Sequence, residues 1–538
     1  MHRQVPCSSG PEFSCTASES ATAKGTATLV FASETPSPPA GEGRGEGELH
    51  VRKWLAPGRE SGQHGRMQLD QESCYQALVS RDPRFDGLMF VGVSSTGIYC
   101  RLICNSRRPL RRNCSFYPNA AAAEQAGFRP CLRCRPELAP GNALVDSRNR
   151  LAVALARRIE DGALNQGSVS TLAAEMGIGD RHLRRVIQNE FGVSPNKLLE
   201  TQRLLTAKLL LTDTALPVID VAFASGFSSL RRFNDAFKSN YRLSPTGFRH
   251  STASAGSGRF VCELAYRPPL DWDAMLEFLS KRLYDGVEAI SASGYMRTVS
   301  LGGRSGWIRV GRSPRRHTLT VELAPELGRA IPAVLTRVRR LFDLGAEPQR
   351  IAQRLGKLAA RQPGLRLPGA FDGFEVAVRA VLGQQISVKA ASTLAGRFAA
   401  AFGEPVAMPF PELRLLMPTA QRVASATSAA LIKIGVTAAR ARTLANVARA
   451  MIANPHLLDP GADVGAALMR VKEIPGIGEW TAQYLAMRAF SWPDAFPATD
   501  LGIRKALGTD DERKILARAE AWRPWRGYAA MHLWRTLK

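Results

Sequence analysis

The sequence predicts a multidomain fold that is mainly α-helical with α+β parts, and three observations lead to this prediction. Its 538 residues suffice for about three to five domains of ordinary size. Two cysteine pairs with short spacing indicate a small zinc domain. Helical periodicity dominates from residue 147 onward, while HTLTVEL at 317–323 alternates apolar and polar residues as a half-buried strand does. We therefore expect, after the zinc domain, a helical domain, an α+β domain and a second, all-α helical domain.

The first segment differs in composition from the rest of the chain. Residues 1–66 include TPSPPAGEGRGEGE at 35–48, which is rich in Pro, Gly and Glu and shows no periodicity. We interpret residues 1–66 as disordered, or as an extension that is not translated, with Met67 as the start. A GSG tract at 256–258 indicates a linker. The four domains are predicted at 67–142, 147–252, 259–365 and 366–538.

The charge balance favours a polyanionic partner. The chain has 72 Lys and Arg against 47 Asp and Glu, a formal net charge of +25. Phosphates release counterions when such a protein binds them, which favours nucleic acid. An arginine-rich codon usage would give any surface the same charge, so charge alone does not decide the partner. No uninterrupted apolar run of about 18 residues and no secretion signal are visible, so we expect a cytoplasmic protein without a membrane span.

The two cysteine pairs predict one zinc ion. Cys100 and Cys104 are followed by Cys131 and Cys134, a spacing that suits a tetrahedral thiolate site. Cys114 is an alternative ligand, although NCSFY resembles the start of a packed strand, and Cys74 fits a core position. A purely structural site is the simpler interpretation. Zinc-bound thiolates nevertheless stay nucleophilic, and nearby arginines are suited to hold a DNA backbone against them: Arg101, Arg107, Arg108, Arg111 and Arg112.

Residues 147–252 contain a helix-turn-helix pattern twice. VSTLAAEMGIGDRHLRRVIQNEFGVSP predicts a short helix to Met176, a turn at Gly177 and a second helix from Gly179 or Asp180. LPVIDVAFASGFSSLRRFNDAF repeats the pattern with a turn at Gly226. A bundle with exposed arginines would share some of these features. The doubled pattern favours DNA reading by basic side chains on the second helix of each unit, namely Arg181, Arg184, Arg185, Arg231 and Arg232. We expect His182 to be an exposed helix residue.

The C-terminal part contains a short glycine turn followed by an aspartate. In VKEIPGIGEWTAQYLAMRAF, Gly476 and Gly478 join two helical segments, allow positive φ and leave amides exposed to a DNA phosphate. About twenty residues later, Asp500 in FPATDLGIRKAL opens another helix. An aspartate there is in the first instance a helix cap.

Two families account for the N-terminal motifs. The blocks SRDPRFDG, TGIYC and NCSFYPNAAAAEQAGFRPCLRCRPE resemble the N-terminal domain of the bacterial adaptive-response protein Ada. This resemblance implies methylphosphotriester repair, with irreversible methyl transfer to Cys100, three further ligands, and Thr96 and Arg107 near the phosphate. Capture of the methyl group lowers the negative charge of the site and would raise its affinity for DNA. The helical part, with AFASGFSS and SPTGFR, resembles the AraC-type regulator domain.

The C-terminal half resembles the AlkA-type 3-methyladenine DNA glycosylases of the helix–hairpin–helix superfamily. The motifs are LPGAFDGFEVAVRAVLGQQISVKAA, IPGIGEWTAQYLAMR and WRPWRGYAAMHLW, and residues 259–365 match that family's N-terminal α+β domain. The resemblance implies catalysis by Asp500, a carboxylate suited to a sugar that becomes positive. It implies a base pocket of Trp480, Tyr484 and Trp534. Side chains such as Trp522, Trp525 and Tyr528 are more often core residues, and we interpret His532 as structural.

Departures from that family refine the prediction. Glu479 and Trp480 stand where bifunctional members carry a lysine, so we expect a monofunctional enzyme that needs no cofactor for base removal. Leu501 replaces an aromatic residue beside the aspartate, and Gln385 replaces an apolar wedge residue at the DNA. No P-C-H-R motif occurs, so the alkylguanine methyltransferase half of full Ada proteins is missing.

The combined prediction is a fusion for alkylation repair and its regulation. It would excise alkylated bases, accept methyl groups from phosphotriesters and activate transcription. The expected partners are alkylated and promoter double-stranded DNA and RNA polymerase, in the bacterial cytoplasm at the nucleoid. One alternative is a regulator whose glycosylase half only binds DNA, and another is a glycosylase whose front half is only a tether.

Overall fold

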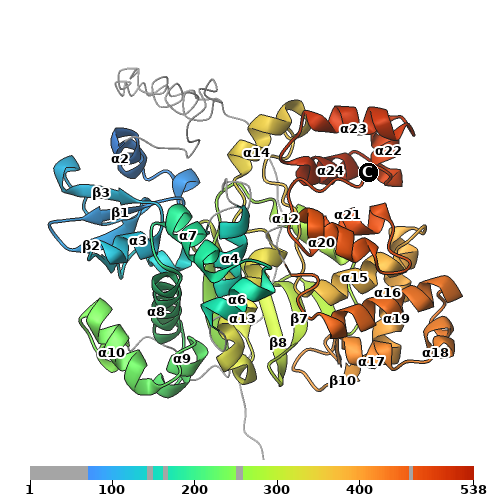
Figure 1. The fold of residues 1–538 in the computed structure, drawn as a ribbon, viewed down its shortest axis with the longest axis horizontal. Coiled ribbons are helices and arrows are strands. Elements are labelled where there is room, and N and C mark those ends of the chain that lie inside the picture. The colour runs from blue at the N-terminus through green and yellow to red at the C-terminus, as the bar shows by residue number, and fades with distance from the viewer. Residues whose placement is uncertain (1–70, 142–149, 161–167, 250–258, 460–463, 538) are drawn as a thin grey trace, which may run out of the picture. The chain divides into compact units, whose positions relative to one another are not determined.

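The structure is a computed structural model that describes residues 71–141, 150–160, 168–249, 259–459 and 464–537 (Figure 1). The predictions for residues 1–66 and for the linker at 256–258 lie outside the described residues. None of the described helices combines the length and apolar character that a membrane crossing requires.

The cysteine-containing domain is built on a four-stranded sheet rather than on loops alone. The strands lie in the order β3-β1-β2-β4, and β1 is antiparallel to both β2 and β3, whereas β4 pairs in parallel with β2. Cys114 begins β3 and is buried, as predicted from NCSFY. The elements are α2 Gln71–Ser80, β1 Phe90–Val93, β2 Ile98–Arg101, β3 Cys114–Tyr117, α3 Ala120–Gln125 and β4 Arg129–Pro130.

The second domain contains both predicted helix-turn-helix units. The first is formed by α6 and α7, the second by α9 and α10, with the long helix α8 between them. Gly177 and Gly226 adopt φ values of +68° and +87° at the two turns, which favours glycine there. Gly179 caps α7, so the predicted start of that helix is confirmed. The helices are α4 Arg150–Glu160, α6 Val169–Glu175, α7 Asp180–Phe191, α8 Pro195–Asp213, α9 Val218–Ala224, α10 Leu230–Tyr241 and α11 Pro245–Phe248.

The third domain is an antiparallel sheet with helices. The strand order is β5-β9-β8-β7-β6, and every neighbouring pair is antiparallel. In β9 the side chains alternate between partly exposed and buried, which confirms the interpretation of HTLTVEL. The elements are β5 Phe260–Ala265, α12 Trp272–Ser280, β6 Glu288–Ser291, β7 Gly294–Leu301, β8 Arg304–Arg312, β9 Thr318–Leu323, α13 Ile331–Leu341 and α14 Pro348–Leu355.

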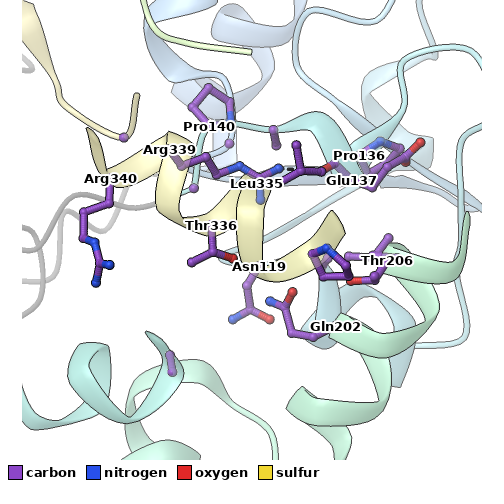
Figure 2. Close-up of a pocket in the computed structure, with 18 of the residues that line it drawn as sticks. Asn119, Pro136, Glu137, Pro140, Gln202, Thr206, Leu335, Thr336, Arg339 and Arg340 are labelled. Atoms are coloured by element: carbon purple, nitrogen blue, oxygen red, sulfur yellow. Dashed lines mark hydrogen bonds between the residues drawn. The ribbon is translucent and has the colours of Figure 1, made fainter. Parts of the chain in front are cut away.

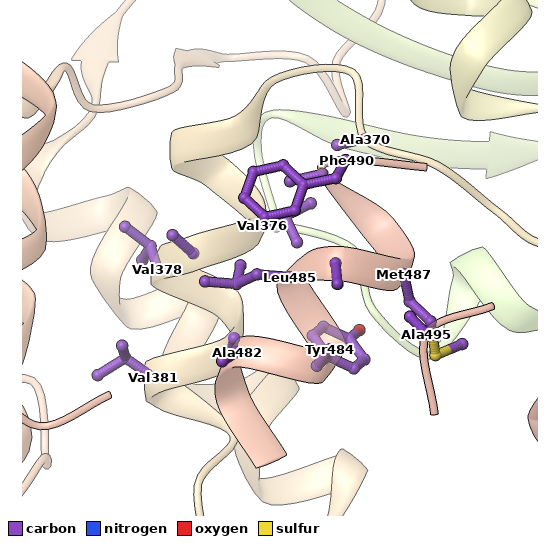
Figure 3. Packing of buried hydrophobic residues seen from close by; sticks show 14 of the residues in the cluster. Ala370, Val376, Val378, Val381, Ala482, Tyr484, Leu485, Met487, Phe490 and Ala495 are labelled. Carbon is purple, nitrogen blue, oxygen red and sulfur yellow. The ribbon is translucent and has the colours of Figure 1, made fainter. Parts of the chain in front are cut away.

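Over its described residues, the C-terminal domain is helical except for one short strand pair. Its core places α15 against α21, where Val378, Val381, Ala482 and Leu485 pack together (Figure 3). This packing fixes the end of the glycine turn that leads into α21. The elements are α15 Gly373–Leu382, α16 Val388–Phe402, β10 Glu404–Pro405, β11 Leu415–Leu416, α17 Ala420–Ala424, α18 Ser428–Lys433, α19 Ala438–Ala453, α20 Val464–Lys472, α21 Glu479–Arg488, α22 Leu501–Leu507, α23 Glu512–Glu520 and α24 Arg526–Arg535.

Candidate metal and catalytic sites

The four predicted cysteines meet at one point. The sulfur atoms of Cys100, Cys104, Cys131 and Cys134 all lie within 4.8 Å of one another. The sheet explains this, because β2 ends beside Cys100 and β4 leads into Cys131, and these two strands are paired. Cys114 is not part of the group, and its thiol donates to the carbonyl of Leu110 at 3.4 Å. The alternative with Cys114 as a ligand is therefore wrong for this fold.

The chemistry of the four sulfurs fits Zn²⁺. Hydrogen bonding to Cys104 raises the pKa of the Cys100 thiol, and hydrogen bonding to Cys100 lowers the pKa of Cys104. Four thiolates this close together repel one another, and a divalent ion would supply the positive charge that they require. One zinc ion bound by these four residues would keep the sulfurs as thiolates.

The arginines around this site differ in how far they are exposed. Arg101 is only 5% exposed and pairs with the Asp86 carboxylate, so its predicted contact with DNA is wrong. Its backbone N–H donates to Cys134 Sγ at 3.3 Å, which makes it part of the metal loop. Arg111 is half-buried against Tyr75. Exposed side chains remain at Thr96, Arg107, Arg108 and Arg112.

The second helix of each helix-turn-helix unit carries exposed basic side chains. Those predicted for DNA contact are all exposed: Arg181, Arg184, Arg185, Arg231 and Arg232. Two of them have a partner within α7, since Arg184 pairs with Asp180 at 3.3 Å and Arg185 approaches His182 Nδ1 at 3.0 Å. His182 is exposed, as expected.

The glycine turn between α20 and α21 needs glycine at only one of its two positions. Gly476 has a φ of +98°, and an added Cβ would lie 1.9 Å from Thr443 Oγ1. Gly478 has a φ of −93° and open space around it, so the prediction of positive φ is wrong there. Both glycines are exposed.

The loop that carries Gln385 is fixed to this turn. The side chain of Gln384 donates to the carbonyl of Gly476 at 3.0 Å and to Thr481 Oγ1 at 3.1 Å. Gln385 itself is exposed and adopts a φ of +55°, which is uncommon for a residue other than glycine. Gln384 therefore ties the loop that carries Gln385 to the turn, a role that the sequence did not indicate.

Asp500 stands at the N-terminus of α22 and is held by three N–H groups. Its Oδ1 accepts from the backbone of Ile503 at 3.1 Å, which is the predicted helix cap. The indole N–H of Trp534 donates to the same oxygen at 2.8 Å, and that of Trp480 donates to Oδ2 at 2.8 Å. Two of the three predicted pocket aromatics thus contact the carboxylate directly, which the sequence did not indicate.

Tyr484, the third predicted pocket aromatic, stacks against Trp480. Their rings stack with centroids 5.4 Å apart and an interplanar angle of 14°, so no base fits between them and the pair forms one wall. Arg488 donates to the Tyr484 hydroxyl at 2.8 Å. Burial would raise the pKa of Tyr484, but the guanidiniums of Arg488, Arg282 and Arg379 lower it. The sequence analysis did not identify these three arginines around Tyr484, because nothing in their spacing connects them.

Other side chains near the C-terminus are structural. Trp525 and Tyr528 are buried, and Trp522 packs against the same core. His532 is buried, and burial lowers its pKa to about 4, so the imidazole is neutral at pH 7 and is no proton donor there.

A cavity of about 320 Å³ lies away from the predicted metal ligands and catalytic residues. Figure 2 shows its walls, which include Gln202 and Thr206 from α8 and Leu335, Thr336 and Arg339 from α13. Among the described residues that line this cavity, none is a predicted catalytic, metal or DNA-contact residue. We assign it no function.

Four family models match the chain in the predicted order. They are the metal binding domain of Ada at residues 73–137, a helix-turn-helix domain at 172–251, the AlkA N-terminal domain at 261–372, and the HhH-GPD superfamily of base excision DNA repair proteins at 378–526. The probable bifunctional transcriptional activator/DNA repair enzyme AlkA of Mycobacterium tuberculosis is 39% identical over 87% of this chain and 97% of its own length.

Two further relatives match shorter parts of the chain. DNA-3-methyladenine glycosylase 2 of Escherichia coli is 38% identical over 51% of this chain and 96% of its own length. The bifunctional transcriptional activator/DNA repair enzyme Ada of Escherichia coli is 35% identical over 24% of this chain and 34% of its own length.

The fold and the two sites define a fusion of an Ada-type metal-binding domain, a helix-turn-helix regulator domain and a base-excision glycosylase. The extent of the match to the mycobacterial protein identifies the particular family. This chain belongs to the family of bifunctional transcriptional activator/DNA repair enzymes AlkA.

Proposed function

We propose that the C-terminal half excises alkylated bases such as 3-methyladenine from double-stranded DNA. The observation that carries this proposal is Asp500, held as a carboxylate acceptor beside the aromatic wall of Trp480 and next to the glycine turn. In the reaction the C1′–N bond breaks and its electron pair leaves with the cationic base, which becomes neutral. Water bonds to C1′ and its surplus proton goes to solvent. Asp500 stabilises the positive charge on the sugar and orients the water.

The enzyme is monofunctional in this proposal. Glu479 begins α21 directly after the turn and pairs with Lys472 at 2.8 Å, so a carboxylate stands where an amine nucleophile would be needed. Base release should leave an abasic site and an intact strand, which alkaline and neutral gel analysis of the product distinguish.

The N-terminal half accepts methyl groups from phosphotriesters. A thiolate of Cys100 bonds to the methyl carbon, the methyl–oxygen bond breaks, and a phosphodiester anion leaves. Zinc bound by the four cysteines would keep that sulfur a thiolate at neutral pH. Thr96 and Arg107 are exposed and available to the phosphate. Loss of one negative charge at the site favours DNA, and we propose that the two helix-turn-helix units then activate a promoter with RNA polymerase, in the cytoplasm at the nucleoid.

One assay tests both activities. The full chain is incubated with methylated duplex DNA, released bases are identified by chromatography, and the protein is then weighed by mass spectrometry. We expect free 3-methyladenine, and one added methyl group on Cys100. Asp500→Asn should abolish base release and keep the added methyl, while Cys100→Ser should do the reverse. Base release that survives Asp500→Asn contradicts the catalytic assignment, and a C-terminal half that only binds DNA gives no release in any variant.

A further inference from the structure

The two indole N–H groups on Asp500 suggest a role for Trp480 and Trp534 beyond that of a pocket wall. Each donates to a different oxygen of the carboxylate, at 2.8 Å in both cases. The donors come from helices α21 and α24, and Asp500 caps α22 between them in the sequence. Three helices are therefore joined at one side chain.

We propose that Trp480 and Trp534 are positioning residues that orient the Asp500 carboxylate through their N–H groups, and that Gly502 is required for this arrangement. The proposal rests on the proposed role of Asp500 in glycosidic cleavage and adds to it a fixed orientation of the reacting oxygen.

The number of donors determines which oxygen is left to react. A carboxylate offers about four lone-pair positions. Among the described residues, Ile503 and Trp534 use two positions on Oδ1, and Trp480 uses one on Oδ2. One position on Oδ2 remains for the water or the sugar. These three hydrogen bonds thus leave Oδ2 as the oxygen that is available to the reaction.

The Trp480 donor is itself held by neighbouring side chains, so its orientation does not have to be formed when substrate binds. The indole of Trp480 stacks on Tyr484, whose hydroxyl is held by Arg488 at 2.8 Å. Arg488 in turn donates to the carbonyl of Gly369 at 3.1 Å. A catalytic group held in this way by its surroundings requires little reorganisation during the reaction.

Gly502 explains how Trp534 reaches Asp500. A Cβ atom at position 502 would lie 2.9 Å from Trp534 Cδ1 and 3.0 Å from Asp500 Oδ1. The first distance is shorter than real Cβ contacts and the second is unusually tight, so a side chain at position 502 would force the Trp534 indole or the Asp500 carboxylate to shift. The neighbouring side chain of Leu501 is 64% exposed, so the structure does not restrict the size of the residue at position 501 in this way.

The test separates an orienting role from a pocket wall. Trp480→Phe and Trp534→Phe keep an aromatic face and remove only the N–H donor. We expect kcat for 3-methyladenine release to fall about 10- to 100-fold, as for other lost orienting hydrogen bonds, with KM changed less than about threefold. Gly502→Ala should lower kcat to a similar extent while both indoles are still present. Trp522→Phe, at a partly buried tryptophan that packs against Phe496 and is not one of the indole donors to Asp500, is the matched control and should keep wild-type kcat.

A second readout does not depend on activity. The chain has eight tryptophans, and the full zinc-loaded protein with ¹⁵N-labelled indoles should give two N–H resonances that move in Asp500→Asn and are absent in the respective Phe variants. Gly502→Ala should move the Trp534 resonance. Wild-type kcat in both Phe variants, or two indole signals that stay in place in Asp500→Asn, would overturn the proposal. If the wild-type protein releases no base but both signals move, the two indole hydrogen bonds to Asp500 are confirmed and the glycosylase assignment is wrong.

Discussion

The metal site takes all its ligands from residues 100–134, whereas the carboxylate site is assembled from three helices with partners at 480, 500 and 534. In the metal site the ligand atoms themselves are close in sequence, and a paired strand brings the two halves together. In the carboxylate site the catalytic candidate is a single residue, and its orientation depends on groups that are not adjacent to it. A local site can thus be lost through one ligand, while the assembled site is sensitive to the packing around it.

The largest expected effect comes from breaking the local site. Cys104→Ser removes one ligand and should release the metal, since structural zinc contributes about 10–16 kcal/mol to the folding of small domains. Metal content by atomic emission and the thermal unfolding of the N-terminal part measure this loss. Cys114→Ser is the control, because Cys114 is equally buried but outside the cluster. Zinc that remains in Cys104→Ser, or disappears in Cys114→Ser, would show that the ligand set is wrong.

The metal site could be predicted because thiol spacing limits the geometry directly. Four short-spaced thiols in a chain without a secretion signal have few uses other than metal binding. The strand-like sequence around Cys114 already favoured a core position over a ligand role. The helix-turn-helix units were predictable for a similar reason, as Gly177 and Gly226 punctuate regular helical patterns. These signals are local, so they survive without knowledge of the tertiary structure.

The carboxylate site shows what sequence cannot supply. The helix cap at Asp500 follows from residue type and position, but the bonds from Trp480 and Trp534 depend on how α21 and α24 pack. The burial of Arg101 was missed in the same way, because its partner Asp86 lies in a turn fifteen positions away. An arginine in a basic run looks exposed until the fold supplies a buried carboxylate.

Substitution of the two glycines in the turn before α21 is expected to have an intermediate effect, which is a loss of stability next to the carboxylate site. Gly476→Ala places a side chain at a φ of +98° and within 1.9 Å of Thr443 Oγ1, so we expect destabilisation of at least about 1–2 kcal/mol from backbone strain alone. Gly478→Ala meets nothing within 4 Å and should cost less than about 1 kcal/mol. Urea midpoints, with duplex DNA affinity measured alongside, compare the two variants. Equal losses would mean that the turn itself, and not the contact with Thr443, sets the requirement for glycine.

The smallest expected effect is that of removing the exposed Arg107, and the buried Arg101 beside the same metal site gives the contrast. Arg107 is exposed, so Arg107→Ala should leave folding and zinc content unchanged and remove one phosphate contact. The slope of log Kd against log salt should then decrease by about 0.9, with affinity reduced about tenfold or less. Arg101→Met should behave in the opposite way, because it leaves the Asp86 carboxylate buried and unpaired and costs about 3–5 kcal/mol of stability. Fluorescence anisotropy across a salt series measures the first variant, and thermal unfolding measures the second. An unchanged salt slope in Arg107→Ala would show that Arg107 does not contact DNA. The arginine that binds phosphate would then have to be Arg108 or Arg112, which are exposed on the same domain.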